Sequence, residues 1–90
     1  MSIAELVAHA LRDSSVRKRR PLLYYGTGVY IGADELMQSV NFWAAGKPID
    51  EKAIDDYIEK VGGQRLGGVL RRQPQYYLPT AVFRELRSRE

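Results

Sequence analysis

The sequence predicts a single α+β domain in which amphipathic helices come first and a β-hairpin follows. The chain has 90 residues, enough for one domain only. Apolar residues recur at helical spacing in the first two thirds of the chain. After Gly62-Gly63 the pattern changes to short extended segments separated by glycine and proline. This change in periodicity separates the helical part from the hairpin. No linker is found along the chain, as expected for a single domain.

The composition excludes several classes of protein. Hydrophobic residues make up 44% of the chain and charged residues 28%, as in a soluble globule. No apolar stretch approaches the ~18 residues that a bilayer span needs, and the start of the chain lacks a secretory signal, so we expect a cytoplasmic protein. There is no cysteine, and His9 is the one histidine. We therefore expect no disulfide, no zinc site, no thiol nucleophile and no cofactor.

The first helix is predicted over residues 3–13. Ser2, followed three residues later by Glu5, fits a capping box at its start. His9 is interpreted as a surface residue, because it has no second ligand or base at useful spacing. The apolar side chains of this helix fall on one face and comprise Ile3, Leu6, Val7, Ala10 and Leu11.

A run of four cations follows this helix, before Pro21, and consists of Arg17, Lys18, Arg19 and Arg20. Two interpretations are open for the arm over residues 16–20. It is either a solvated loop or a phosphate-contacting segment, since adjacent cations repel one another unless an anion is near. The next segments, 22–25 and 29–31, are β-prone and flank a glycine turn. That turn lacks the third glycine and the lysine of nucleotide-binding loops.

Two helices joined by a tight corner are predicted over residues 33–61. The first of them begins at Ala33 and ends at Gly46, the usual place of a C-terminal glycine. Trp43 lies on its apolar stripe and is expected to anchor the core. Lys47-Pro48 forms the corner.

The second helix of this pair is predicted over residues 51–61. Asp50 is its expected N-cap, and Ile49 and Ile54 are placed as a hydrophobic staple. Gly62-Gly63 ends it.

A hairpin is predicted over residues 65–79, with a proline turn in its middle. Tyr76 and Tyr77 alternate across the second strand, so one faces the core and the other faces solvent, without an indication of which. The outward ring can either pack on the strand or stack on an unpaired base. Thr80 is then expected to cap a short last helix whose inward side chains are Val82, Phe83 and Leu86.

Charge is distributed unevenly along the chain, whose formal net charge is +3. Residues 1–31 carry five basic and two acidic groups, residues 32–60 carry three and seven, and residues 65–90 carry six and two. Most of the cations are arginine, whose planar fork suits phosphate and base edges. The acidic middle and basic flanks indicate a nucleic-acid partner more than they indicate a fold.

The element order is that of a winged helix-turn-helix domain: a helix, a short strand, two helices with a tight corner, and an arginine-bearing hairpin. Residues 29–79 resemble, more particularly, the small C-terminal winged-helix domain of viral and plasmid primase-helicases. The resemblance implies a winged-helix fold and nucleic-acid binding over one domain, residues 1–90. The Walker-type loop of those large enzymes does not occur here. The segments that carry the resemblance are Ala33-Asp34-Glu35-Leu36, Asn41-Phe42-Trp43, Ile49-Asp50 and Tyr76-Tyr77-Leu78-Pro79.

We therefore expect a non-enzymatic protein that binds double-stranded DNA in transcription or replication, of viral, plasmid or archaeal origin. DNA phosphates are expected to contact the arm, the wing and the start of the third helix. At the start of that helix the exposed backbone N–H groups also favour an anion. Enzyme chemistry is disfavoured, because the chain has one histidine and adjacent carboxylates on a helix point about 100° apart. The predicted contacts are Arg17, Lys18, Arg19, Arg20, Lys47, Lys52, Arg65, Arg71, Arg72 and Tyr76.

One feature departs from the family pattern. The helix over residues 51–61, which should enter the major groove, carries five acidic residues with its cap and only two lysines. Phosphates repel such a helix. The alternative function is therefore a protein–protein adaptor that docks a basic partner through Asp55, Asp56 and Glu59. A homodimer is compatible with either function.

Overall fold

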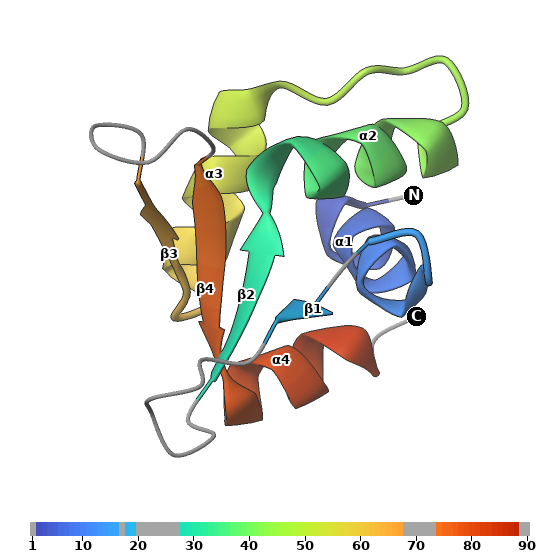
Figure 1. Ribbon diagram of the computed structural model, residues 1–90. Helices are drawn as coiled ribbons and strands as arrows, with labels where there is room; N and C mark the ends of the chain where they lie inside the picture. The colour runs from blue at the N-terminus through green and yellow to red at the C-terminus, as the bar shows by residue number, and fades with distance from the viewer. Residues whose placement is uncertain (1, 17, 20–27, 68–73, 89–90) are drawn as a thin grey trace.

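The computed structural model describes residues 2–16, 18–19, 28–67 and 74–88. Within these ranges the chain forms four helices and an antiparallel sheet, which confirms the predicted α+β class (Figure 1). The predicted strand over 22–25 and the middle of the predicted wing lie outside the described residues. The elements in chain order are α1 (Ile3–Arg12), β1 (Lys18–Arg19), β2 (Gly28–Gly32), α2 (Ala33–Trp43), α3 (Glu51–Lys60), β3 (Gln64–Leu66), β4 (Gln75–Pro79) and α4 (Thr80–Arg87).

The sheet has the strand order β1-β2-β4-β3, and all neighbours are antiparallel. β2 and β4 pair along their whole length, with Tyr30 opposite Tyr77 and Ile31 opposite Tyr76. β3 continues the hairpin on the other side of β4, and Gln64 lies opposite Tyr77. The strand near residue 30 is therefore joined to the hairpin in one sheet.

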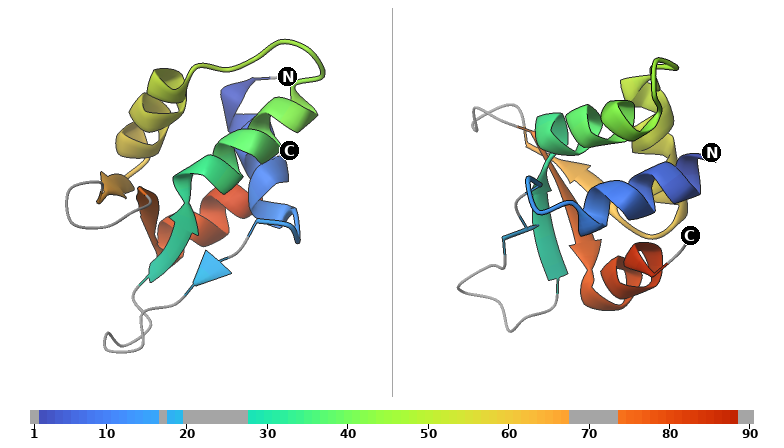
Figure 2. Two further views of the ribbon diagram at one scale, coloured as in Figure 1. Left: turned by 45° about the horizontal axis from the view of Figure 1, so that its top comes forward. Right: turned by 90° about the vertical axis from the view of Figure 1, so that its right-hand side faces the viewer.

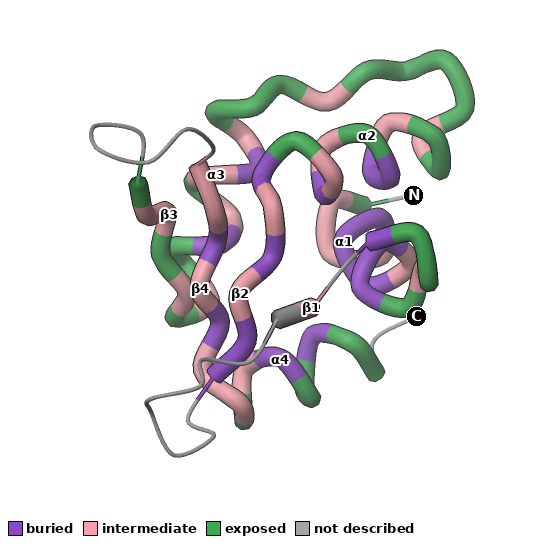
Figure 3. Tube along the Cα trace, in the orientation of Figure 1, coloured by how far each residue is buried: buried purple, intermediate pink, exposed green. Residues whose placement is uncertain are grey.

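The described helices pack on one face of this sheet (Figure 2). α2 and α4 contact β2 and β4, α1 packs against α2 and α4, and α3 lies against β3. Burial alternates along β2 and β4 as Figure 3 shows, because successive strand residues point to opposite faces. The core joins the helical stripes to the inner face of the sheet, and its largest fully buried side chains are Tyr76, Leu6, Leu11, Ile31, Leu36, Ile54, Ile58, Leu78 and Leu86.

Local signals at the helix ends are mostly confirmed. The Ser2 hydroxyl accepts from the backbone N–H of Glu5, and the Glu5 carboxylate accepts from the N–H of Ser2, which completes the capping box. Gly46 has φ +90° after α2, a left-handed conformation that favours glycine. Asp50 occupies the N-cap position of α3 but makes no capping side-chain bond. Thr80 is the first residue of α4, and the cap position belongs to Pro79.

The expectation that Trp43 anchors the core is wrong. Its side chain is 39% exposed, and its ring stacks on His9 with centroids 4.6 Å apart. Neighbouring Phe42 is 74% exposed. Val40 is the last fully buried residue of α2, and Ala44 after it still packs against the core, whereas Phe42 and Trp43 of the last turn are exposed. No helix among the described residues is long and apolar enough to cross a membrane.

Candidate nucleic-acid interface

Several of the predicted DNA contacts cannot be placed. Arg17, Arg20, Arg71 and Arg72 lie outside the described residues. The backbone of Arg19 pairs with Tyr30 at the β1 edge of the sheet. These cations are therefore assigned by sequence alone.

Lys18 is held by the structure near α1. Its Nζ donates a hydrogen bond to the backbone carbonyl of Asp13 at 2.7 Å. Desolvation lowers the pKa of Lys18, and the positive charge of Arg87 lowers it further, against the opposing effect of Asp13. Lys18 therefore anchors β1 to the end of α1, a role that the sequence did not indicate.

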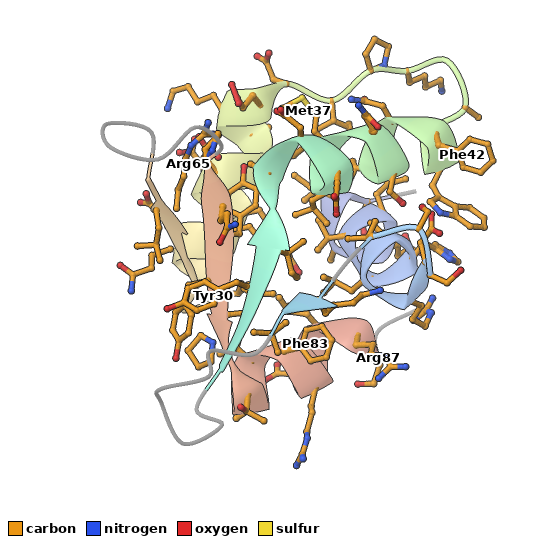
Figure 4. All side chains as sticks on the ribbon, in the orientation of Figure 1. Tyr30, Met37, Phe42, Arg65, Phe83 and Arg87 are labelled. Carbon is orange, nitrogen blue, oxygen red and sulfur yellow. The ribbon has the colours of Figure 1, made fainter. Side chains whose placement is uncertain are left out.

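Arg65 also has partners within the protein. Its Nη1 donates to both carboxylate oxygens of Asp55 at 2.9 Å, and its Nη2 donates to Glu51 at 3.0 Å. These bonds raise the pKa of Arg65, so the guanidinium stays charged. Figure 4 shows Arg65 near α3, where it forms ion pairs with Glu51 and Asp55. Arg65 thus fastens β3 to α3 instead of extending freely toward a phosphate.

Tyr76 does not face solvent, so its assignment as a DNA contact is wrong. It is fully buried, and its hydroxyl donates a hydrogen bond to Asp55. Burial raises the pKa of Tyr76, and the hydrogen bond to Asp55 raises it further. Tyr77 is the outward residue of the pair and packs against Tyr30 across the strands. A base can stack only on that outward side of the sheet.

The start of α3 keeps its lysines at the surface. Lys47 is exposed in the corner before the helix, and Lys52 is exposed in its first turn. Lys52 pairs with Asp56 at 3.2 Å, with side-chain exposures of 82% and 65%. Both lysines can reach an anion, because an exposed ion pair of this kind is weak.

The acidic set proposed for protein docking is divided by the fold. Asp55 is partly buried and accepts hydrogen bonds from Arg65 and Tyr76, so its carboxylate already has partners within the protein. Asp56 and Glu59 are exposed. The set therefore does not form one uniform acidic face.

Carboxylates are absent from two segments of the chain that together contain the described strands. Residues 14–33 and 60–84 contain no Asp or Glu. All four strands therefore lack carboxylates, whereas the helices and their ends carry nearly all of them. The net charges of the three parts of the chain do not show these two carboxylate-free segments, although they can be read directly from the sequence. The cations of these two segments are Arg17, Lys18, Arg19, Arg20, Lys60, Arg65, Arg71, Arg72 and Arg84.

A second surface feature lies along α2, beside the end of α1. An open depression of about 710 Å³ is bordered by the exposed aromatic pair Phe42 and Trp43, whose rings meet edge to face. Charged and polar side chains form the rest of its lining, including His9, Arg12 and Glu35. Sequence reasoning did not single out Phe42, although its place off the apolar stripe of α2 is a usable signal.

No group of three or more His, Cys, Asp or Glu side chains in the described part of the chain could hold a metal ion. Comparison with protein-family models, with curated proteins and with solved structures finds no match to this chain. The functional argument therefore depends on the residues and their arrangement.

Proposed function

We propose that this protein is a non-enzymatic DNA-binding domain of the winged-helix type, acting in transcription or replication. The helix pair α2–α3 is inserted between β2 and the β3–β4 hairpin, and β4 lies between β2 and β3. This order supports a winged-helix assignment, in which the hairpin is the wing.

The observation that carries the proposal is the absence of Asp and Glu from residues 14–33 and 60–84. These segments contain every strand and the connections that adjoin them. The two segments carry an excess of cations, and clustered cations attract a polyanion, because each phosphate that they neutralise releases condensed counterions. Clustered arginine is also suited to bidentate phosphate contacts.

The contacts of Arg65 support the proposal indirectly. The acidity of α3 argues against its approach to DNA, but Arg65 pairs with Glu51 and Asp55 and offsets one of their two negative charges from within the protein. Lys52 offsets Asp56 on the exposed side of the same helix. The remaining repulsion is smaller than the sequence of α3 suggests.

The proposed phosphate contacts are the arm cations Arg17, Arg19 and Arg20, the wing cations Arg71 and Arg72, and Lys47 and Lys52 at the start of α3. Lys18, Arg65 and Tyr76 are instead assigned to holding β1, β3 and β4 in place, on the contacts described above.

Fluorescence anisotropy with a labelled DNA duplex at two salt concentrations tests the proposal. The double variant Arg71→Ala/Arg72→Ala should bind more weakly, and its salt dependence should be shallower by about 2 in the slope of log K against log salt. Lys60→Ala removes an exposed cation outside the proposed contact set and is the matched control. Absence of duplex binding at low salt, or an equal loss in both variants, would overturn the assignment.

A second function, docking to another protein, is favoured by the exposed Phe42 and Trp43. Figure 4 shows Phe42 at the opposite end of the molecule from Tyr30 on the sheet. Exposed aromatic side chains are typical of interface centres. A second copy of the chain is the first partner to test, by sedimentation velocity of wild type and Phe42→Ser. A dimer lost in Phe42→Ser would support docking, and a monomer at all concentrations would argue against self-association.

A further inference from the structure

The end of α2 presents two aromatic rings whose neighbours hold them in place. Phe42 is 74% exposed and Trp43 is 39% exposed. The Phe42 ring meets the Trp43 ring edge to face with centroids 5.6 Å apart, and His9 stacks on Trp43. Figure 4 shows Phe42 at the end of α2, directed away from the helices. Rings that are already fixed lose little side-chain entropy when a partner covers them.

An apolar hollow lies next to these rings, between α1 and the corner that follows α2. Its volume is about 430 Å³. A cavity of roughly 150 Å³ is already able to hold benzene, so this hollow can accept a phenyl ring. Lys47 is charged, and the remaining lining residues are apolar or aromatic: Leu6, Trp43, Ala44, Ala45 and Ile49.

Ala45 lines this hollow in a conformation that alanine rarely adopts. Its φ is +55°, and among the residues that the structure describes it is the one non-glycine residue with a positive φ. Glycine would hold the same conformation without steric strain. Backbone strain is concentrated at functional surfaces, because it persists only where the surrounding structure enforces it. The strain is therefore a second indication, independent of the exposed rings, that this surface is used.

Trp43 lines two hollows that differ in charge. The depression along α2 is lined by two carboxylates and one guanidinium, whereas the smaller hollow carries Lys47. Glu35, one of the two carboxylates, lies on the same face of α2 as Phe42, since seven residues are almost two helical turns. A two-fold axis near Trp43 would set the acidic side of one copy against the basic side of the other. The surface is thus complementary to itself in shape and in charge.

We propose that two copies of this chain associate through this surface about a two-fold axis, with Phe42 of each copy in the smaller hollow of the other. Lys47 of one copy then faces Glu35 of the other, and Lys52 is left as the phosphate contact at the start of α3. The inference rests on the docking function proposed above and names its partner. A second copy supplies both the ring that fills the hollow and the opposite charge. The surface is confined to the end of α2 and its surroundings, so we expect association at about micromolar concentration and a monomer in dilute unfolding experiments.

Sedimentation velocity over a concentration series tests this arrangement by reversing charges. Phe42→Ser should weaken the dimer about 100-fold. Lys47→Glu and Glu35→Lys should each weaken it about 10-fold, because like charges then face one another. An equal mixture of these two variants should associate as tightly as wild type, since both contacts of the mixed dimer join opposite charges. Lys60→Glu, a charge reversal at an exposed position of α3, should associate like wild type.

Failure of this arrangement is distinguishable from failure of the docking function. A dimer that is lost in Phe42→Ser but unchanged in Lys47→Glu supports docking and overturns the two-fold arrangement. A monomer at every concentration overturns self-association altogether, and neither result alters the test of duplex binding.

Should Glu35→Lys fail to fold, carbodiimide cross-linking decides the matter on wild type, in an equal mixture of isotope-labelled and unlabelled chains. Mixed-isotope links between Lys47 and Glu35 support the arrangement. Mixed-isotope links without that pair, or no mixed-isotope links, overturn it.

Discussion

Arg65 and Asp55 form a two-bond contact, in which Nη1 of the arginine donates to both oxygens of the carboxylate at 2.9 Å. Asp55 also accepts the hydroxyl hydrogen of Tyr76. One carboxylate on α3 therefore holds β3 through Arg65 and β4 through Tyr76. This contact fixes α3, the second helix of the pair, against the hairpin strands.

Removing Arg65 should destabilise the protein more than removing an exposed cation. Arg65→Met leaves Asp55 and Glu51 without their guanidinium, and it should lower the free energy of unfolding by about 1–3 kcal/mol. Lys52→Met removes the exposed pair with Asp56 and should cost about 0–0.5 kcal/mol. Urea unfolding followed by circular dichroism measures both. Equal values would show that the partly buried network adds nothing.

Tyr76 should make the protein sensitive to alkaline pH. The pKa of Tyr76 is raised above its ordinary value of 10.0 by burial and by Asp55. The folded state therefore keeps this phenol protonated where the unfolded chain ionises it. The resulting stability is fully present below pH about 10 and is lost as pH rises toward the folded pKa.

The alkaline limb of the stability profile tests this expectation. Wild type should lose unfolding free energy above pH about 10, and Tyr76→Phe should show a shallower loss, although it is less stable at neutral pH. Tyr30→Phe, on the face of the sheet turned away from the helices, is the control. A slope unchanged in Tyr76→Phe would assign the alkaline loss to other groups.

Gly63→Ala should be destabilising because the space for a side chain is already occupied. A Cβ atom there would lie 2.6 Å from Leu78, 2.8 Å from Ile58 and 2.9 Å from the backbone oxygen of Tyr77. Overpacking of this kind costs about 1–3 kcal/mol. Gly32→Ala meets its first neighbour at an ordinary 3.5 Å, so its cost is limited to the poorer N-cap preference of alanine at the start of α2, about 0.5–1 kcal/mol. Thermal unfolding of the two variants should rank them in this order.

Truncation at two positions of α2 should separate its core from its exposed end. Leu36 is fully buried, so Leu36→Ala should cost about 2–5 kcal/mol. Phe42 is 74% exposed, and Phe42→Ser should leave stability within about 0.5 kcal/mol of wild type. Denaturant midpoints give both values. A large loss in Phe42→Ser would mean that this ring is covered in solution, as a dimer would cover it.

Elements with strong local signals were predictable from the sequence. The capping box of Ser2 and Glu5, the apolar stripe of α1 and Gly46 after α2 depend on contacts within a few residues. Trp43 was mispredicted, because its helical position matched the stripe but the last turn of α2 leaves it exposed. Periodicity shows which face of a helix is apolar, but it does not show where along the helix the neighbouring elements end.

For the candidate site, the sequence predicted the distribution of charge but not which side chains contact one another. Residue type and spacing were enough to predict the α+β class, the approximate extent of the helices and the uneven distribution of charge along the chain. The packing of distant segments was needed to show that Arg65 pairs with Asp55, that Tyr76 is the inward tyrosine, and that Tyr30 meets Tyr77. Strand register and burial depend on which distant segments pair. No local pattern records that pairing, because the energies that select it arise only when the whole core packs.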